Sequence, residues 1–251
     1  MSRFTGKVAL VTGGGSGIGR ATALAFAREG ATVVVAGRQA EPLDQAVTLI
    51  EAEGGRASAV PADVSSSEDV ARLVATTVER HGGLHIAFNN AGVLAPGPLA
   101  DLDEAAWDHQ LAVNLTGVFL CMRHEIAHMR ANGGGVIVNT ASNIGAHLRI
   151  PYLGAYAATK AAVSALTRAA AREYIGEGIR INAISPGPVE TSMSLRPGEA
   201  EADRAERLKD ALPIGRAGTL AEAAAAVLWL ASPEAGFTVG HDLVIDGGAS
   251  A

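Results

Sequence analysis

Tyr156 and Lys160 stand four residues apart in the segment "PYLGAYAATKAAVSAL", whose pattern is typical of a helix. Side chains at this spacing share one helix face, with Cβ atoms about 6 Å apart. An ammonium group beside a phenol favours the phenolate and lowers the phenol's pKa from about 10. The pair therefore indicates a general acid/base that works near neutral pH. The only other lysines in the sequence are Lys7 and Lys209, which argues against Lys160 being a plain surface charge.

Two further polar residues stand in apolar surroundings. Ser142 follows the run "VIVNTA", so its hydroxyl lies where a buried strand ends and could polarise a substrate carbonyl. Capping of a turn is the alternative role for that hydroxyl. Asn114 lies in "LAVNLTGVF", within an expected helix over residues 103–131. A buried amide needs partners, which are either water and backbone at a functional kink or a neighbouring loop.

Glycine is concentrated in "TGGGSGIGR", between the first expected strand and the first expected helix. Backbone N–H groups in such a turn approach a pyrophosphate closely because no Cβ intervenes, and the helix N-terminus favours negative charge. The spacing Gly13-x3-Gly17-x-Gly19 differs from G-x-G-x-x-G, and a tight turn without a ligand is the alternative. The place of the turn between the first strand and the first helix favours dinucleotide binding.

The second expected strand ends in "VVVAGRQ", where dinucleotide-binding folds usually carry an acidic residue that binds the adenosine ribose. Gly37 removes that carboxylate and its repulsion of a 2′-phosphate. Arg38 offers a planar, permanently charged guanidinium to the same phosphate. The pattern favours NADP(H) over NAD(H). NAD(H) is the alternative if Arg38 stacks on adenine or faces solvent.

Apolar runs rich in Val and Ile alternate with longer amphipathic segments along the chain. The expected strands cover residues 7–12, 31–36, 57–62, 84–90, 135–141, 179–185 and 242–246. The expected helices cover residues 17–29, 40–53, 67–81, 103–131, 154–176 and 219–231. This alternation indicates an α/β fold, a single doubly wound Rossmann-type domain over residues 1–251 with about seven parallel strands between two helical layers. Residues 186–213 are polar and poorly periodic, and we expect them to cover the substrate.

Composition narrows the range of partners. A net charge of −6 argues against nucleic acid, which needs a basic face on the protein. No segment approaches the roughly 18 uninterrupted apolar residues of a membrane span, and the N-terminus resembles no secretion signal, so a cytoplasmic location is expected. Cys121 is the only cysteine, which excludes an intrachain disulfide. Small molecules are the expected partners.

Residues 124–128 read "HEIAH" and match the H-E-x-x-H pattern of zinc hydrolases. A zinc site also needs a third protein ligand, often an acid some twenty residues further on. The next acidic residue after Glu125 is Glu173, and the only histidine between His128 and His241 is His147. The pattern therefore favours a polar helix face over a zinc hydrolase, and no metal site is expected.

Taken together, these residues resemble the short-chain dehydrogenase/reductase family over essentially the whole chain. A carbonyl reductase or a 3-oxoacyl-acyl-carrier-protein reductase is the kind of member that the sequence resembles. The resemblance is carried by "TGGGSGIG" at 12–19, "ADV" at 62–64, "NNAG" at 89–92, Asn114 in "VNLTG", Ser142, "YAATK" at 156–160, "NAISPGPVETSM" at 182–193 and the terminal "DGG".

The resemblance implies a catalytic tetrad of Asn114, Ser142, Tyr156 and Lys160. In this tetrad Tyr156 exchanges a proton with the substrate oxygen, which Ser142 polarises. Lys160 holds the nicotinamide ribose and lowers the pKa of Tyr156, and Asn114 holds a water that links Lys160 to solvent. The implied cofactor contacts, besides Tyr156 and Lys160, are Gly13, Ser16, Gly17, Ile18, Gly19, Arg38, Asp63, Val64, Asn90, Val189 and Thr191.

The implied reaction is hydride transfer between NADP(H), or NAD(H), and a ketone or secondary alcohol of moderate size. A homotetramer or homodimer is implied as well. Ser142 and Tyr156 are 14 residues apart, about one more than is common in the family, and the difference falls in "NIGAHLRIPYL" beside the substrate. A non-catalytic sensor of the cofactor is the alternative function, but a sensor has no need for an activated tyrosine.

Overall fold

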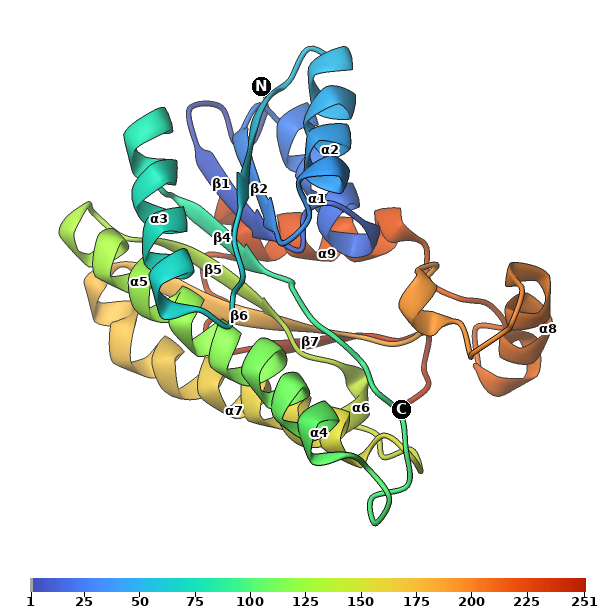
Figure 1. The fold of residues 1–251 in the computed structure, drawn as a ribbon. Coiled ribbons are helices and arrows are strands. Elements are labelled where there is room, and N and C mark those ends of the chain that lie inside the picture. The colour runs from blue at the N-terminus through green and yellow to red at the C-terminus, as the bar shows by residue number, and fades with distance from the viewer. Residues whose placement is uncertain (1) are drawn as a thin grey trace.

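Apolar runs form seven parallel strands in the computed structural model, which describes residues 2–251 (Figure 1). The strands are β1 (Val8–Thr12), β2 (Thr32–Gly37), β3 (Arg56–Pro61), β4 (Ile86–Asn89), β5 (Gly135–Thr140), β6 (Ile179–Pro186) and β7 (Asp242–Ile245). Their order across the sheet is β3-β2-β1-β4-β5-β6-β7. Each predicted strand is found, and the predicted doubly wound parallel sheet is confirmed.

Helices cover both faces of this sheet (Figure 1). They are α1 (Gly17–Arg28), α2 (Ala40–Ala52), α3 (Ser67–His81), α4 (Glu104–Leu111), α5 (Gly117–Ala131), α6 (Asn143–Ala146), α7 (Gly154–Tyr174), α8 (Glu201–Ala211) and α9 (Leu220–Ala231). Side chains of α1, α2 and α9 share one core cluster with the sheet, and those of α3, α5 and α7 share another. Two separate cores therefore lie on opposite faces of the sheet.

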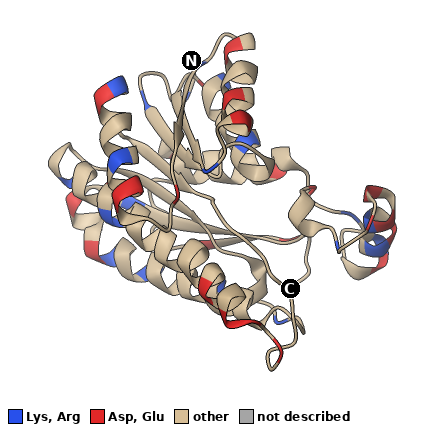
Figure 2. Cartoon of the chain, viewed as in Figure 1, with Lys and Arg blue, Asp and Glu red and all other residues tan. Residues whose placement is uncertain are grey.

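Charged residues lie mainly on the outer faces of the helices and on α8, and the strands carry few (Figure 2). This distribution follows from burial of the strands on both faces, since an unpaired charge there would be costly. Among the described residues, no helix combines the length and the apolar character needed to cross a membrane.

The predicted helix over residues 103–131 is interrupted. Helix α4 ends at Leu111, and a π-helical segment, η1 (Ala112–Thr116), leads from it into α5. Asn114 is fully buried in η1, where its Oδ1 accepts the Val93 N–H at 2.8 Å and its Nδ2 donates to the Val93 carbonyl at 2.9 Å. Local widening of a helix in this way is common at functional sites. These hydrogen bonds pair Asn114 with the loop after β4.

Helix α8 forms inside residues 186–213, where the sequence pattern predicts no helix. Only two of its eleven residues are buried, so it lacks the apolar stripe that periodicity would detect. Polar contacts hold it instead: Arg207 forms two hydrogen bonds with Glu199, and Arg204 donates to the Thr191 carbonyl at 3.0 Å. In Figure 1, α8 projects away from the sheet, next to the ends of β6 and β7.

A polar cluster is buried between the sheet and helices α5 and α7. Glu125 is fully buried, and its Oε2 accepts a hydrogen bond from Asn89 Nδ2 at 3.0 Å. The same Nδ2 donates to Asn139 Oδ1, and the Asn139 amide donates to Thr167. Glu125 Oε1 and Asn89 Oδ1 have no hydrogen-bond partner among the described residues. Both of these oxygens are acceptors, and a proton on Glu125 would add a hydrogen-bond donor to the cluster. Burial raises the pKa of Glu125 to about 7, which favours this protonated form.

We predict that Glu125→Gln makes stability less dependent on pH. The folded chain keeps a proton on Glu125 that the unfolded chain releases near the ordinary pKa of 4.5, so this residue's contribution to stability falls as pH rises from 4.5 to about 7. Relative to Glu125→Gln, the wild-type free energy of unfolding should fall by about 2.5 kcal/mol between about pH 5 and pH 8. Urea unfolding measures this difference, with the exposed Glu79→Gln as control. A difference that does not change with pH would contradict a buried, protonated carboxyl.

Candidate active site

The carboxyl ends of the parallel strands meet at one edge of the sheet, and most candidate residues follow these ends. The glycine turn follows β1, Asn90 follows β4, Ser142 comes just after β5, and Val189 and Thr191 follow β6. The strand order reverses between β1 and β4, which is where open α/β sheets form a ligand crevice. The structure therefore places these residues, far apart in sequence, at one edge.

Close packing of the backbone explains the glycines of the turn. Gly13 has a φ of 64° and Gly17 a φ of 49°, both in the left-handed region that favours glycine. A Cβ on Gly19 would lie 2.2 Å from the Gly13 carbonyl oxygen and 2.6 Å from Asn90 Nδ2. Asn90 Nδ2 in turn donates to the carbonyls of Thr12 and Gly13, at 3.2 and 3.4 Å. The side chain of Asn90 thus supports the turn itself.

Helix α1 begins with donors that no protein group uses. Within residues 2–251, the N–H groups of Gly17, Ile18 and Gly19 have no hydrogen-bond partner, and the exposed Ser16 does not cap the helix. A helix N-terminus of this kind attracts an anion. Thr191 reaches the same place, since its Cγ2 lies 3.3 Å from where a Cβ on Gly17 would stand. Together with the glycine turn, these features fit the pyrophosphate of a dinucleotide.

The end of β2 offers both room and positive charge. Arg38 is exposed there, near the carboxylate of Asp63. Hydrogen bonding with the Ser65 hydroxyl is the main cause that lowers the pKa of Asp63, and the charge of Arg38 adds to it. A Cβ on Gly37 would make an ordinary contact with Leu43, 3.5 Å away, so position 37 accepts a side chain.

Val64 and Val189 point into the protein. Val64 is 7% exposed and packs with Val70 and Val113 beneath α5. Val189 is 5% exposed, and the carbonyl of Pro188 beside it accepts the Gly218 N–H at 2.9 Å. A cofactor would therefore meet these two valines through their backbone, not through their side chains.

Tyr156, in the first turn of α7, lies near Ser142, which comes just after β5. Ser142 Oγ also accepts the Ile144 N–H at 3.2 Å, so its hydroxyl caps α6 as well. Burial raises the pKa of Tyr156, and the neighbouring Ser142 hydroxyl lowers it by less. This differs from the expectation that Lys160 lowers that pKa. The reason is that the phenol is removed from solvent while Lys160 Nζ lies 5.8 Å from the centre of its ring.

Lys160 is buried, and its Nζ donates to the Thr140 carbonyl at 2.7 Å. Burial lowers the pKa of Lys160 to about 8, because the charged form loses its hydration. A Cβ on Gly92 would lie 3.6 Å from this Nζ and 3.3 Å from Asn114 Oδ1. The absence of a side chain at position 92 therefore leaves space between the two polar groups. All four residues of the proposed tetrad come together in this region.

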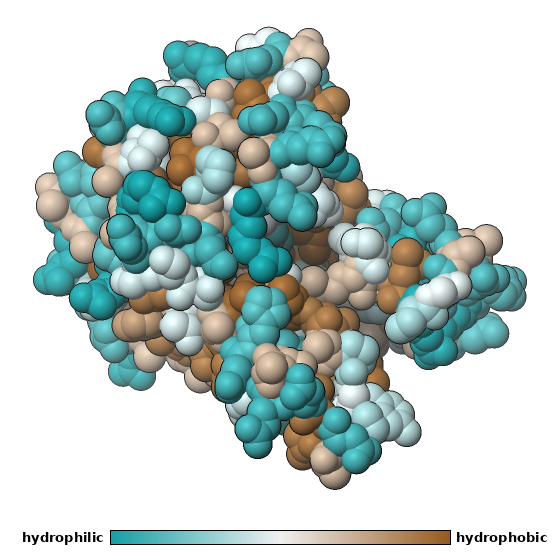
Figure 3. Space-filling view, in the orientation of Figure 1, coloured by the Kyte–Doolittle hydropathy of each residue, from teal (hydrophilic) through white to brown (hydrophobic). Residues whose placement is uncertain are grey.

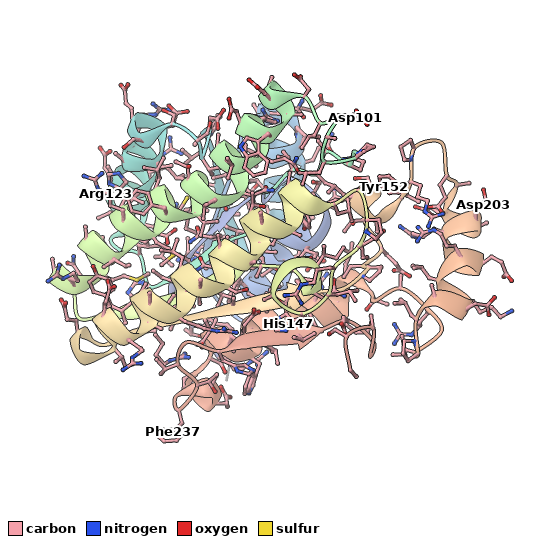
Figure 4. All side chains as sticks on the ribbon, turned by 90° about the horizontal axis from the view of Figure 1, so that it is seen from below. Asp101, Arg123, His147, Tyr152, Asp203 and Phe237 are labelled. Atoms are coloured by element: carbon pink, nitrogen blue, oxygen red, sulfur yellow. The ribbon has the colours of Figure 1, made fainter. Side chains whose placement is uncertain are left out.

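Exposed apolar side chains occur in the loops at this edge: Leu99 after β4, Ile150 and Tyr152 after β5, and Met193 after β6. Figure 3 shows hydrophobic residues along the hollow between α8 and the rest of the molecule. Among residues 2–251, Tyr152 is the only non-glycine residue with a positive φ, at 69°. Strained backbone of this kind clusters at functional sites. No motif or periodicity signals this strain, and Figure 4 shows Tyr152 on the side of the molecule that faces α8.

The "HEIAH" residues of α5 do not converge on one point. Glu125 is turned into the core onto Asn89, and His128 Nε2 faces the Leu84 N–H at 3.3 Å. The part of the chain that the structure describes contains no group of three His, Cys, Asp or Glu residues that could hold a metal ion. The polar, partly buried face of α5 accounts for this pattern.

Known proteins are similar to this chain over nearly all of its length. The family model described as Enoyl-(Acyl carrier protein) reductase matches residues 13–250. Cyclohexanol dehydrogenase of Acinetobacter sp. (strain SE19) is 42% identical, over 98% of this chain and 96% of its own. 2,5-Dichloro-2,5-cyclohexadiene-1,4-diol dehydrogenase of Sphingobium indicum is 43% identical, over 100% of both chains. The crystal structure of a short-chain type dehydrogenase/reductase from Mycobacterium marinum superposes with a TM-score of 0.93 at 35% identity, over 98% of this chain and 96% of the other.

We predict that Gly19→Ala disrupts the glycine turn. The new Cβ would lie 2.2 Å from the Gly13 oxygen, so the backbone of the turn must move. We expect a loss of roughly 1–3 kcal/mol in the free energy of unfolding and at least about tenfold weaker binding of a nicotinamide dinucleotide. Thermal unfolding and fluorescence titration measure the two effects. The control is Gly176→Ala, where nothing lies within 4 Å of the added Cβ. Equal binding by both variants would show that the turn does not hold the ligand.

Proposed function

Because the chain belongs to the short-chain dehydrogenase/reductase family, we propose that it transfers hydride between NADP(H) and a secondary alcohol or ketone. One observation carries this proposal. Tyr156 is buried near Ser142, one helical turn before Lys160, at the sheet edge that also holds the glycine turn. A proton donor and acceptor thus shares an edge with a turn suited to a dinucleotide.

A bound nicotinamide cofactor supplies or accepts the hydride, and the protein residues handle the proton. Burial raises the pKa of Tyr156, so its hydroxyl stays protonated near neutral pH and can donate to a carbonyl oxygen during reduction. In the reverse direction the phenolate must form before the alcohol proton is taken. The ammonium of Lys160, held on the Thr140 carbonyl, is the nearby charge that favours this phenolate.

Ser142 polarises the substrate oxygen in this proposal. Its oxygen accepts the Ile144 N–H at 3.2 Å, so the hydroxyl is oriented before the substrate arrives. A donor that needs no reorganisation stabilises developing charge effectively. Asn114 holds the backbone at Val93 and meets Thr159 on α7, which keeps the helix that carries Tyr156 beside the loop after β4.

For the substrate we propose a secondary alcohol or ketone on a six-membered ring. Two of the relatives described above are named for activity on cyclohexanol and on a dichlorinated cyclohexadiene diol. The exposed apolar side chains of Leu99, Ile150, Tyr152 and Met193 lie in loops at the edge that holds Ser142 and can cover an apolar ring. We also propose that residues 186–213, which include α8, cover the bound substrate.

For the cofactor we propose a preference for NADP(H) over NAD(H). Gly37 places no carboxylate at the end of β2, and the exposed Arg38 is the charged group nearest to that position along the chain. A guanidinium binds a phosphate through two parallel hydrogen bonds. A cofactor sensor without catalysis would need these residues but not the buried pair of Tyr156 and Ser142.

We predict that Tyr156→Phe lowers turnover without loss of cofactor binding. Removal of the hydroxyl removes the proton donor and acceptor, which should lower kcat by about 10²- to 10⁴-fold. Cyclohexanol oxidation with NADP⁺ and cyclohexanone reduction with NADPH measure turnover, and fluorescence titration measures binding. Tyr174→Phe is the control, since Tyr174 lies near the far end of the same helix. Unchanged turnover in Tyr156→Phe would contradict the proposed chemistry.

We predict that Gly37→Asp combined with Arg38→Leu shifts the cofactor preference to NAD(H). The new carboxylate repels a 2′-phosphate, and loss of the guanidinium removes a charge-assisted contact. The ratio of kcat/KM for NADP⁺ to that for NAD⁺ should fall by about 100-fold. Arg56→Leu, which removes an exposed arginine at the other end of the sheet, is the control. If the double variant keeps the wild-type ratio, the assigned role of Arg38 is wrong.

A further inference from the structure

A buried carboxylate at the start of β7 accepts hydrogen bonds from three different elements. The side chain of Asp242 is only 1% exposed. Its Oδ2 accepts from Ser164 Oγ at 2.6 Å and lies 3.0 Å from His147 Nε2, and its Oδ1 accepts from Ser185 Oγ at 2.5 Å. Three donors compensate the carboxylate for its loss of hydration. None of the motifs that suggested the function includes Asp242.

Two of these donors belong to elements that carry proposed catalytic residues. His147 ends the short segment that begins at Ser142, and Figure 4 shows it beside the turn of α6. Ser164 lies on α7, one helical turn beyond Lys160, and Ser185 lies in β6. A single carboxylate therefore ties the segment of Ser142 to the helix of Tyr156 and Lys160.

The segment from Ser142 to His147 is compact. The Leu148 N–H donates to the Asn143 carbonyl at 2.7 Å, which closes the segment on itself. Gly145, with a φ of 135°, packs so tightly against the backbone of α7 that a Cβ would lie 2.8 Å from a carbonyl oxygen. Asn143 Nδ2 also donates to Oδ2 of Asp246, the residue that follows β7, at 3.2 Å. The segment is thus closed on itself, and it is anchored to α7 and to residues on and just beyond β7.

We propose that His147 and Asp242 are positioning residues that hold Ser142 against Tyr156 in the geometry needed for proton transfer. The proposal rests on the proposed function, since it assigns a role within the same site. An imidazole protonated at Nε2 and an imidazolium both donate to a carboxylate, so this anchor persists in either protonation state of His147. The side chain of His147 is 23% exposed, so its replacement leaves the core intact.

The test compares three variants of the full chain. His147→Leu removes the donor, whereas His147→Gln restores an N–H near the position of Nε2. His241→Leu is the matched control, because His241 is the exposed histidine next to Asp242. Steady-state kinetics with cyclohexanol and NADP⁺ give kcat and KM. Hydrogen–deuterium exchange measured by mass spectrometry on peptides within residues 142–153 reports the mobility of the segment.

We expect His147→Leu to lower kcat by about tenfold or more with an unchanged KM for NADP⁺, because displacement of Ser142 affects the chemical step alone. Exchange within residues 142–153 should rise in the same variant. His147→Gln and His241→Leu should stay within about threefold of the wild-type kcat. An unchanged kcat in His147→Leu, or an equal loss in His147→Gln, would overturn the proposal.

Failure of the proposed function gives a different result. If the wild type oxidises no cyclohexanol with NADP⁺ or NAD⁺ and reduces no cyclohexanone with NADPH, the proposed function is wrong. Hydrogen exchange then tests whether the contact between His147 and Asp242 holds the segment in place, because this measurement does not depend on turnover. If the segment exchanges equally fast in the wild type and in His147→Leu, the positioning role of His147 and Asp242 is wrong. Faster exchange in His147→Leu, together with the wild-type rate in His147→Gln, supports that role.

Discussion

The hydrogen bonds where β1 and β4 end are the constraint on which the rest of the site depends. Thr12 Oγ1 accepts the N–H groups of Asn90 and Ala91, at 3.0 and 3.2 Å, and the amide of Asn90 donates back to the carbonyls of Thr12 and Gly13. Helices cover both faces of the sheet here, so any of these groups left unpaired would destabilise the fold. The same bonds hold the glycine turn next to the loop that Asn114 fixes at Val93.

Burial acts in opposite directions on the two titratable groups of the site. It raises the pKa of Tyr156 and lowers that of Lys160 to about 8, because each loses the hydration of its charged form. For the proposed function, a phenol that keeps its proton suits reduction of a carbonyl, whereas oxidation of an alcohol requires the phenolate to form first.

The sequence predicts the elements well where burial leaves a periodic pattern. The strands are continuous apolar runs, and the helices that cover them show amphipathic spacing, so both follow from hydrophobicity alone. Periodicity does not detect η1, because Asn114 widens the helix through a contact with Val93 that lies outside it. It does not detect α8, which depends on the pairing of Arg207 with Glu199. The positive φ of Tyr152 and the inward side chain of Val64 likewise depend on tertiary packing, which no local motif encodes.

Strand β7 comes last in the chain, yet Asp242 and Asp246 anchor the segment that begins at Ser142. During synthesis, six strands and all four residues of the proposed tetrad leave the ribosome before residue 242 does. The glycine turn and its neighbours in β1 and β4 can therefore assemble while Ser142 still lacks its anchor. The order of synthesis therefore permits the glycine turn to assemble before Asp242 is available to bind the segment that carries Ser142.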